Sequence, residues 1–258
     1  MLAGNLIKKR RVGFGFKVFV LMVGGFVISQ NAFAHVRQYA FTEQYRTIPQ
    51  GQFELEGWTT FKVPSWREAG ENGIQYQGEL EYGITDRWSI SHYEAWETRN
   101  QVGSDDATVY DSFKFETKYR IGEKGKYFVD PLVYLEWETE PREEENKNTL
   151  EAKIVLSKDW KKWNASYNQI MESKLGSGGR TTHEFALAVS REIPKGGHAG
   201  FEFSGTYWTP SSNRNEIALG PSLAWGFNYF WVATGILFGL NHETDDFRAR
   251  IIVGIPIG

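Results

Sequence analysis

The feature of the sequence that most constrains the fold is an alternation of apolar and polar residues, repeated from residue 52 to the end of the chain. Phe53 and Leu55, for example, alternate with Glu54 and Glu56. A period of two places successive side chains on opposite faces of a β-strand. No segment of any length shows the 3.6-residue period of an amphipathic helix. The sequence therefore predicts an all-β protein.

Twelve strands are expected, most of them longer than the roughly five or six residues usual in globular sheets. They lie at 52–63, 73–84, 87–98, 108–121, 126–138, 149–158, 160–172, 181–192, 198–208, 216–226, 229–240 and 246–257. Short turns are expected at 82–88, 122–126, 158–160, 194–197 and 226–228, and longer polar connections at 64–72, 99–107, 139–148, 173–180, 209–215 and 241–245. Long and short connections alternate, which is typical of outer-membrane barrels. The sequence predicts one closed, antiparallel up-and-down β-barrel.

The alternation does not decide which face of the barrel is apolar, because a soluble barrel with an apolar interior has the same period. Two features favour an apolar outer face in contact with lipid. The polar face carries both signs of charge on one strand, as in Lys114, Glu116 and Lys118, which suits pairing across a narrow lumen. Aromatic residues make up 16% of the chain, and the tryptophans gather near strand ends, as in the girdles of membrane barrels. They are Trp58, Trp66, Trp88, Trp96, Trp137, Trp160, Trp163, Trp208, Trp225 and Trp231.

The first residues have the pattern of a secretory signal peptide. Lys8, Lys9, Arg10, Arg11 and Lys17 form a basic start, residues 18–28 are apolar, and Ala32 and Ala34 offer a cleavage site. The apolar run is too short to span a bilayer of about 30 Å as a helix. We expect a signal peptide at 1–34, a periplasmic lead-in at 35–51 and an outer-membrane barrel at 52–258. An inward plug formed by the lead-in is the alternative for that segment.

Composition excludes several classes of function. Five of the 29 basic residues lie in the first 34 positions, so 24 remain against 32 acidic residues, a net charge of −8. This excess of acidic residues argues against a basic patch that would bind nucleic acid. The chain has no cysteine, which excludes disulfides and thiolate metal sites. No cofactor is expected, and the expected partners are outer-membrane lipid, the barrel-insertion machinery and small solutes, with the oligomeric state left open.

Two segments carry a resemblance to a known group. GQFELE at residues 51–56 and GELEYGITDRW at residues 78–88 resemble bacterial outer-membrane barrels regarded as transporters, of which the family linked to the MetA pathway of phenol degradation is the best known. The resemblance implies a barrel in the outer membrane of a Gram-negative cell, with a transport role. One departure is the end of the chain, Ile255-Pro256-Ile257-Gly258, where many such barrels end in an aromatic residue.

Candidates for catalysis or metal binding are weak, and we expect no enzyme activity and no metal. Ser91 and His92 are adjacent, so on a strand they point to opposite faces and cannot act as nucleophile and base. His35 could chelate copper if cleavage made it the N-terminus, but no second histidine lies near it in the sequence. The acidic segments 104–106, 143–145 and 243–246 could offer oxygen ligands to calcium, although their spacing matches no dedicated site.

The lumen is the best candidate for a function. The residues expected to line it are Glu54, Glu56, Glu79, Glu81, Lys114, Glu116, Lys118, Arg120, Glu136, Glu151, Lys153, Glu202, Arg248 and Arg250. They could line a polar passage or pair with one another and close it, since charged rings set which solutes pass. We therefore expect a passive channel or transporter-like pore for small solutes. A non-conducting barrel that supports the envelope or binds a partner, and a soluble periplasmic ligand-binding barrel, are the alternatives.

Overall fold

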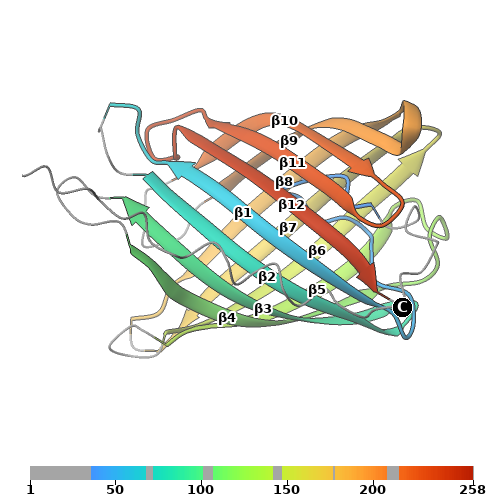
Figure 1. Cartoon of the computed structure of the whole chain (residues 1–258), viewed down its shortest axis with the longest axis horizontal. Coiled ribbons are helices and arrows are strands. Elements are labelled where there is room, and N and C mark those ends of the chain that lie inside the picture. The colour runs from blue at the N-terminus through green and yellow to red at the C-terminus, as the bar shows by residue number, and fades with distance from the viewer. Residues whose placement is uncertain are drawn as a thin grey trace, which may run out of the picture.

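A computed structural model of the whole chain describes residues 36–67, 72–100, 107–141, 147–176, 178–207 and 215–257. Within these residues the chain forms twelve long strands and one short 3₁₀ turn, Pro194–Gly196 (Figure 1). The strands are β1 (Phe53–Val63), β2 (Asn72–Thr85), β3 (Trp88–Asn100), β4 (Ala107–Arg120), β5 (Asp130–Glu140), β6 (Lys147–Trp160), β7 (Trp163–Leu175), β8 (Thr181–Ile193), β9 (Gly197–Tyr207), β10 (Ile217–Gly226), β11 (Trp231–Gly239) and β12 (Phe247–Ile257).

The strands close into a single barrel. Each pairs antiparallel with its neighbours in sequence, and β1 pairs with β12 from Phe53 opposite Ile257 to Val63 opposite Phe247. Closure leaves no free sheet edge, so the strand ladders satisfy one another's backbone groups. The predicted twelve-stranded antiparallel barrel is confirmed. In the described part of the chain, no helix is long and apolar enough to cross a membrane.

One end of the barrel carries mostly short connections, as expected, but one of them is longer than the sequence suggested. β5 begins at Asp130 rather than at residue 126, so the connection from β4 spans residues 121–129. Asp130 Oδ1 accepts a hydrogen bond of 2.7 Å from the Gly125 amide, and Gly122 O accepts one of 2.6 Å from the Tyr45 hydroxyl. The connection therefore folds over this end of the barrel instead of turning directly into the next strand.

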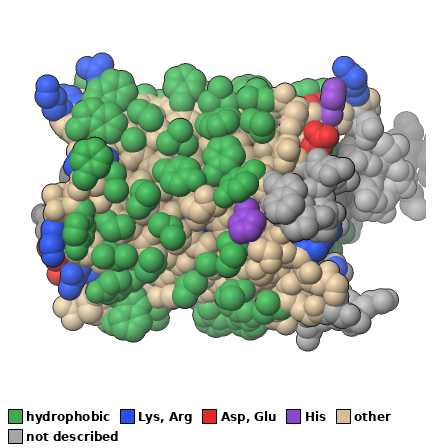
Figure 2. All heavy atoms as spheres, turned by 180° about the vertical axis from the view of Figure 1, so that it is seen from behind, with side chains coloured by type: hydrophobic (Ala, Val, Ile, Leu, Met, Phe, Trp, Pro, Cys, Tyr) green, Lys and Arg blue, Asp and Glu red, His purple; other side chains and the backbone are tan. Residues whose placement is uncertain are grey.

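The outer face of the barrel is apolar. Figure 2 shows hydrophobic side chains spread over the wall seen from behind, with most of the charged groups near the two ends. Large apolar residues exposed on this face include Leu55, Leu80, Ile90, Phe115, Val133, Leu135, Ile154, Leu187, Phe201, Leu219, Leu223 and Ile251. They occupy the alternate strand positions, as the period of two requires. This is the surface that a lipid bilayer would cover.

The interior is polar, which is the reverse of a soluble barrel with an apolar core. Lys118, Glu54, Glu79 and Glu202 are among the largest side chains that are fully buried. Buried charges persist only when they are paired or hydrogen-bonded, so the barrel interior must be a network of polar contacts. The arrangement disagrees with the soluble alternative, in which the apolar residues face inward.

The tryptophan prediction is wrong at two positions. Trp58 and Trp231 do not belong to an outer girdle but are buried in the lumen. Each has charged neighbours there: Trp231 Nε1 donates to Glu54 Oε2 at 3.0 Å, and the guanidinium of Arg37 lies 4.6 Å from the centre of a Trp58 ring. A cation above an indole ring is attracted to its negative face, which explains an aromatic residue on the polar side of the strand. Trp66, Trp88, Trp160 and Trp163 are exposed at strand ends or in an adjoining connection, and Trp208 lies outside the described residues.

The lumen wall has two chemically different sides. β1, β2, β4 and β5 project long charged side chains, whereas β8, β10 and β11 project mainly small ones. The small residues are Ala186, Ala188, Ser190, Ala218, Ser222, Ala224, Ala233 and Gly235. A Cβ added at Gly235 would lie 2.9 Å from the Cβ of Ala40, a residue that precedes the barrel in sequence. The small side therefore leaves room for a segment of chain inside the barrel.

Candidate functional site

That segment is residues 36–48, which we call the plug. Figure 1 shows this blue part of the chain inside the barrel, toward the end where the C-terminus lies. From Tyr39 to Ile48 all but two of its side chains are buried. The expectation of a periplasmic lead-in is therefore wrong for these residues, and the alternative of an inward plug is what the structure contains. The plug is short, but it can still occupy the lumen, because side chains of the wall already fill much of that space.

The plug is held to β7 and β9 by polar side chains of the wall. Both oxygens of Glu202 accept backbone hydrogen bonds of 2.8 Å, one from the amide of Ala40 and one from that of Phe41. Asn168 Oδ1 accepts a bond of 2.7 Å from the Glu43 amide. A chain without regular structure must satisfy its buried amides in this way. These wall residues therefore act as a template for the plug backbone.

On the opposite side the plug places two arginines beside the acidic wall, and Arg37 lies 3.9 Å from Glu56. Arg46 pairs with Glu54 and, at 3.3 Å, with Glu56, while Arg37 pairs with Glu43 of the plug itself at 2.9 Å. Burial raises the pKa of Glu43, but Arg37 and other nearby cations lower it more, to about 2. Glu43 therefore remains ionised near neutral pH, and its ion pair with Arg37 is retained.

The plug leaves the lumen across the EYGITDRW segment, residues 81–88. A Cβ at Gly83 would lie 2.1 Å from Pro49 O, so only glycine permits the close approach of the two backbones. Asp86 accepts two further bonds, from Thr47 Oγ1 to its carbonyl oxygen at 2.8 Å and from the Gln50 amide to Oδ1 at 3.0 Å. The most recognisable motif of the sequence thus forms the seat for the end of the plug.

Replacing Gly83 with valine is expected to unseat the plug. The added side chain cannot coexist with the backbone of residues 48–49, so one of the two segments must move. Trypsin cleavage after Arg46, detected by mass spectrometry of the folded protein in detergent, is expected to accelerate by about tenfold or more as the buried segment becomes accessible.

Gly57→Val is the matched control, because a Cβ at Gly57 meets nothing within 4 Å on the outer face. Equal cleavage rates in the two variants would show that Gly83 does not hold the plug in place.

Half of the residues predicted to line the lumen pair with one another. Lys118 lies 3.1 Å from Glu81 and 3.0 Å from Glu116. Lys114 lies 3.2 Å from Glu136, and Lys153 lies 3.0 Å from Glu151. Of the remaining predicted residues, Glu54, Glu56 and Glu202 contact the plug, and Arg250 donates to Ala40 O and Thr60. Arg248 pairs with Glu216 and Asp245, and Arg120 donates to Asp86 O. Glu79 has no hydrogen-bond donor among the described residues.

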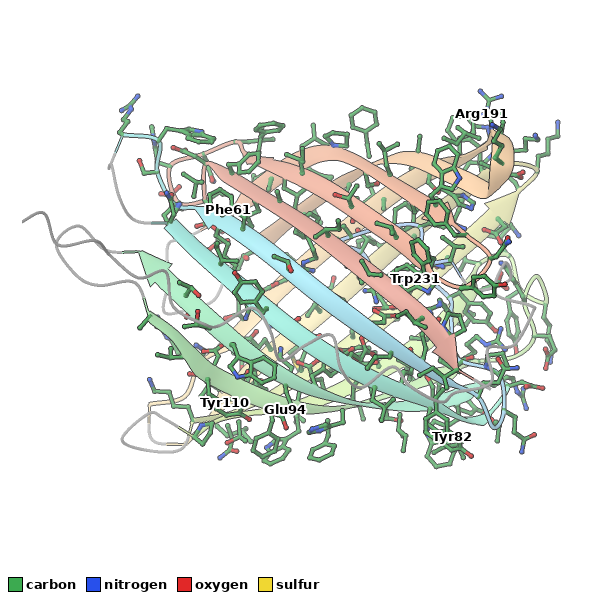
Figure 3. All side chains as sticks on the ribbon, in the orientation of Figure 1. Phe61, Tyr82, Glu94, Tyr110, Arg191 and Trp231 are labelled. Atoms are coloured by element: carbon green, nitrogen blue, oxygen red, sulfur yellow. The ribbon has the colours of Figure 1, made fainter. Side chains whose placement is uncertain are left out.

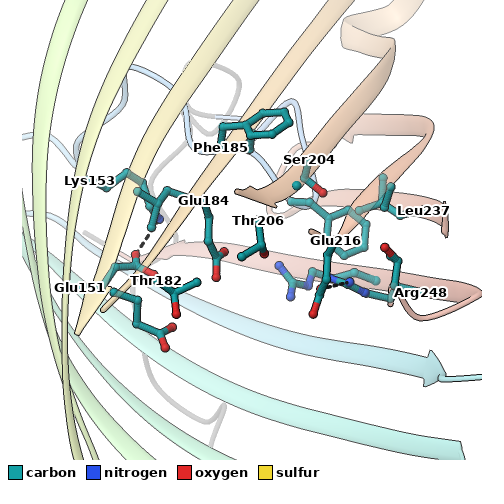
Figure 4. Close-up of a pocket in the computed structure, with 18 of the residues that line it drawn as sticks. Glu151, Lys153, Thr182, Glu184, Phe185, Ser204, Thr206, Glu216, Leu237 and Arg248 are labelled. Carbon is teal, nitrogen blue, oxygen red and sulfur yellow. Dashed lines mark hydrogen bonds and ion pairs between the residues drawn. The ribbon is translucent and has the colours of Figure 1, made fainter. Parts of the chain in front are cut away.

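A cavity of about 910 Å³ occupies the half of the lumen on the side of the long connections. Phe41 of the plug is among the residues that line it, together with charged groups of β6–β8 and β12 (Figure 4). Glu151 and Lys153 face each other across 3.0 Å, and Arg248 lies 3.0 Å from Glu216. The other lining charges are Glu172, Lys174, Arg180, Glu184 and Arg250. The cavity therefore offers both signs of charge to a solute.

A second recess, of about 340 Å³, lies at the short-turn end. It is lined by the other side of the plug, including Gln44 and Arg46, and by Asp86 and Arg120 of the wall. The cavity and the recess share no lining residue, and plug residues belong to both. The plug therefore lies between two spaces in opposite halves of the barrel.

The weaker sequence candidates take other places. Ser91 is buried in the lumen, whereas His92 lies on the outer face, 3.0 Å from Glu94, which also accepts a bond from Tyr110. Figure 3 shows Glu94 and Tyr110 pointing away from the barrel. In the acidic segment 243–246, Asp246 accepts a 2.6 Å bond from the Trp66 amide. His35 and the segments 104–106 and 143–145 lie outside the described residues.

Sequence reasoning missed the charged residues of the plug and several that line the cavity. Arg37, Glu43 and Arg46 precede the first alternating segment, so no period marked them. Glu172 and Glu184 alternate with outward-facing residues of β7 and β8. The period of two in these strands therefore places both side chains in the lumen. The sequence signal for the plug is the set of small residues at inward positions of β8, β10 and β11, because larger side chains there would fill the space that the plug occupies.

Comparison with known proteins supports the barrel but not a specific family. No family model and no curated protein matches the sequence. Solved structures do match. The COG4313 outer membrane channel from Pseudomonas putida F1 has a TM-score of 0.59 at 10% identity, covering 82% of this chain and 97% of that one. The fold is that of outer-membrane β-barrels.

Two further matches show how widely the fold is shared. The NanC porin has a TM-score of 0.50 at 10% identity over 80% of this chain and 99% of its own. The translocator domain of the autotransporter NalP from Neisseria meningitidis has a TM-score of 0.51 at 8% identity over 83% and 90%. Because a shared fold does not fix a function, membership of the MetA-pathway family stays a prediction.

Proposed function

We propose that this chain is an outer-membrane channel for small polar solutes that is held closed by its own N-terminal plug. The observation that carries the proposal is the charged cavity of about 910 Å³ with a plug residue, Phe41, among its lining groups. A lumen that served only as a packed core would leave no such space on one side of a separate segment. Displacement of residues 36–48 would join this cavity to the recess at the other end.

The outer surface supports a location in the outer membrane. Its apolar wall and the exposed tryptophans near strand ends are the features by which a barrel fits a bilayer. The likeness of the fold to outer-membrane channels points the same way. The proposal includes no catalytic role.

The plug is suited to reversible displacement because most of the contacts that hold it are polar. One apolar cluster adds to them, in which Tyr45 packs with Leu132, Tyr134 and Val155. Glu202 and Asn168 bind its backbone, and Arg46 binds the acidic wall. Water can replace hydrogen bonds and ion pairs of this kind at modest net cost, unlike a large apolar interface. A charged solute in the cavity could compete for the same groups.

The test is single-channel conductance of the refolded protein in a planar bilayer. Wild type is expected to give discrete but infrequent steps, because the plug closes the lumen most of the time. Glu184 lines the cavity, so Glu184→Lys is expected to move the reversal potential in a KCl gradient toward anion preference. Glu192→Lys, which changes an exposed residue near the short-turn end of β8, is expected to leave the reversal potential unchanged.

The second candidate is a non-conducting barrel that binds a partner or solute without passing it. The contacts that favour it are the same ones that close the lumen, since ion pairs and the plug fill the half nearest the short turns. A barrel that inserts but never conducts, with the plug or without it, would support this candidate over the channel.

A further inference from the structure

Four glutamates of the hairpin β1–β2 face the lumen as two opposed pairs. Glu54 lies opposite Glu81, and Glu56 lies opposite Glu79, in the register of the two strands. We call these four residues the glutamate quartet. Each is only 1% exposed. Like charges directly opposite one another on a sheet repel, so this arrangement needs a compensating positive charge.

The cations around the quartet reach only part of it. Arg46 binds one side of Glu54 and Glu56, and Lys118 binds Glu81. Both oxygens of Glu79 lack a hydrogen-bond donor among the described residues, as does one oxygen each of Glu56 and Glu81. The nearest cation to that Glu56 oxygen is Arg37, at 3.9 Å. A buried carboxylate without a donor or counterion is costly, so something else is expected to satisfy these oxygens.

The geometry fits a metal ion. One carboxylate oxygen from each of Glu54, Glu56 and Glu81 lies within 4.8 Å of the others. Calcium binds carboxylate oxygens at about 2.3–2.6 Å, so two ligands of one ion lie up to about 5 Å apart. Glu79, directly opposite Glu56, adds oxygens that lack a donor. Arg46 and Lys118 are the two direct cations of the quartet, and Lys118 is shared with Glu116. Two cations therefore face five carboxylates, and a divalent ion would offset most of the excess negative charge.

We propose that the glutamate quartet binds a divalent cation, for which calcium is the best match. The expected ligands are oxygens of Glu54, Glu56 and Glu81, which already lie close together, and the unpaired Glu79 opposite Glu56 completes the set. Arg46 continues to bind the other side of Glu54 and Glu56. The site lies in the lumen wall and not in the acidic connections that the sequence suggested. It ties β1 to β2 beneath the plug. The inference goes beyond channel activity, since such a site would exist in a conducting or a non-conducting barrel.

Terbium luminescence tests the site directly. Tb³⁺ occupies calcium sites and emits when an excited indole lies close by, and here Trp231 Nε1 is 3.0 Å from Glu54 Oε2. The full chain is refolded in detergent, stripped with EDTA and titrated with Tb³⁺ while tryptophan is excited. We expect a saturable signal that Ca²⁺ displaces. Glu79→Gln is expected to weaken Tb³⁺ binding by at least about tenfold, because it removes a charged ligand.

Glu81→Gln is a second variant in case Glu79→Gln does not refold. Glu138→Gln is the matched control, because Glu138 also projects into the lumen but has Lys114 and Ser112 as partners. Binding that is absent from wild type, or equal in wild type and the quartet variants, would overturn the proposal and indicate carboxyl groups that share a proton instead. Conductance is measured separately, so failure of the metal site and failure of the channel are distinguishable.

Discussion

Deletion of residues 36–48 is expected to raise the mean conductance of the barrel by at least about tenfold. The plug lies between the cavity and the recess at the short-turn end, and its removal would join the two spaces into one polar passage. The wall that remains would still carry the acidic residues of β1 and β2, so the open passage is expected to prefer cations. The measurement is single-channel recording of the deleted and full-length proteins under the same salt.

Deletion also removes Arg37 and Arg46, which could weaken the barrel, so a second variant tests the same prediction without removing any charge. Ala40 and Gly235 can be changed together to cysteine, since the Cβ atoms would lie 2.9 Å apart and a small shift reaches disulfide geometry. The chain has no other cysteine. The oxidised protein is expected to be silent, and a reductant is expected to restore the steps. Conductance that is indifferent to both the deletion and the crosslink would rule out the plug as the gate.

Replacement of Lys118 with methionine is expected to lower the free energy of unfolding by about 3–5 kcal/mol. The ammonium is 1% exposed and lies 3.1 Å from Glu81 and 3.0 Å from Glu116. Methionine has a similar volume, so the change leaves two buried carboxylates without their cation rather than a void. Urea titration of the detergent-folded protein, followed by tryptophan fluorescence, measures the loss.

Lys124→Met is the matched control. Its ammonium lies 2.5 Å from Asp159, but it is 56% exposed, and surface pairs contribute less than about 1 kcal/mol. Adding Glu81→Gln to Lys118→Met is expected to recover part of the lost stability by removing one of the stranded charges. If Lys118→Met cost no more than Lys124→Met, the lumen would be far better hydrated than its burial indicates.

The barrel could be predicted from the sequence because the pattern that specifies each strand lies within that strand. A period of two fixes which side chains face lipid, and Glu54, Glu56 and Trp58 fall on one face whatever the neighbouring strands do. The start of β5 was misplaced because residues 126–129 look like a strand but belong to a connection that covers the barrel end. Trp58 and Trp231 depart from the girdle prediction because their positions in β1 and β11, and not their residue type, decide that they face the lumen.

The plug could not be predicted in the same way, because its structure depends on partners far along the chain. Ala40 and Phe41 bind Glu202, and Glu43 binds Asn168, so neither contact leaves a periodic signal near residue 40. Whether the charged residues line an open passage or pair with one another also depends on distances across the lumen. The alternation of residues along a strand does not give these distances. Gly83 is a local signal, because this glycine follows Glu79 and Glu81 at an inward position of β2, where the backbone of another segment can approach closely.

The long sequence separation between the plug and its partners on β7 and β9 also orders the assembly of the protein. Residues 40 and 43 cannot reach their final partners until β7 and β9 are in place, 125 to 162 residues further on. Contacts between distant residues form late, because closing a long loop must precede any gain from the contact. The pair that closes the barrel joins residues still further apart, from Val63 with Phe247 to Phe53 with Ile257. By the same rule we expect the wall to close around a plug that already lies against β7 and β9, so that the envelope meets no open bore while the protein folds.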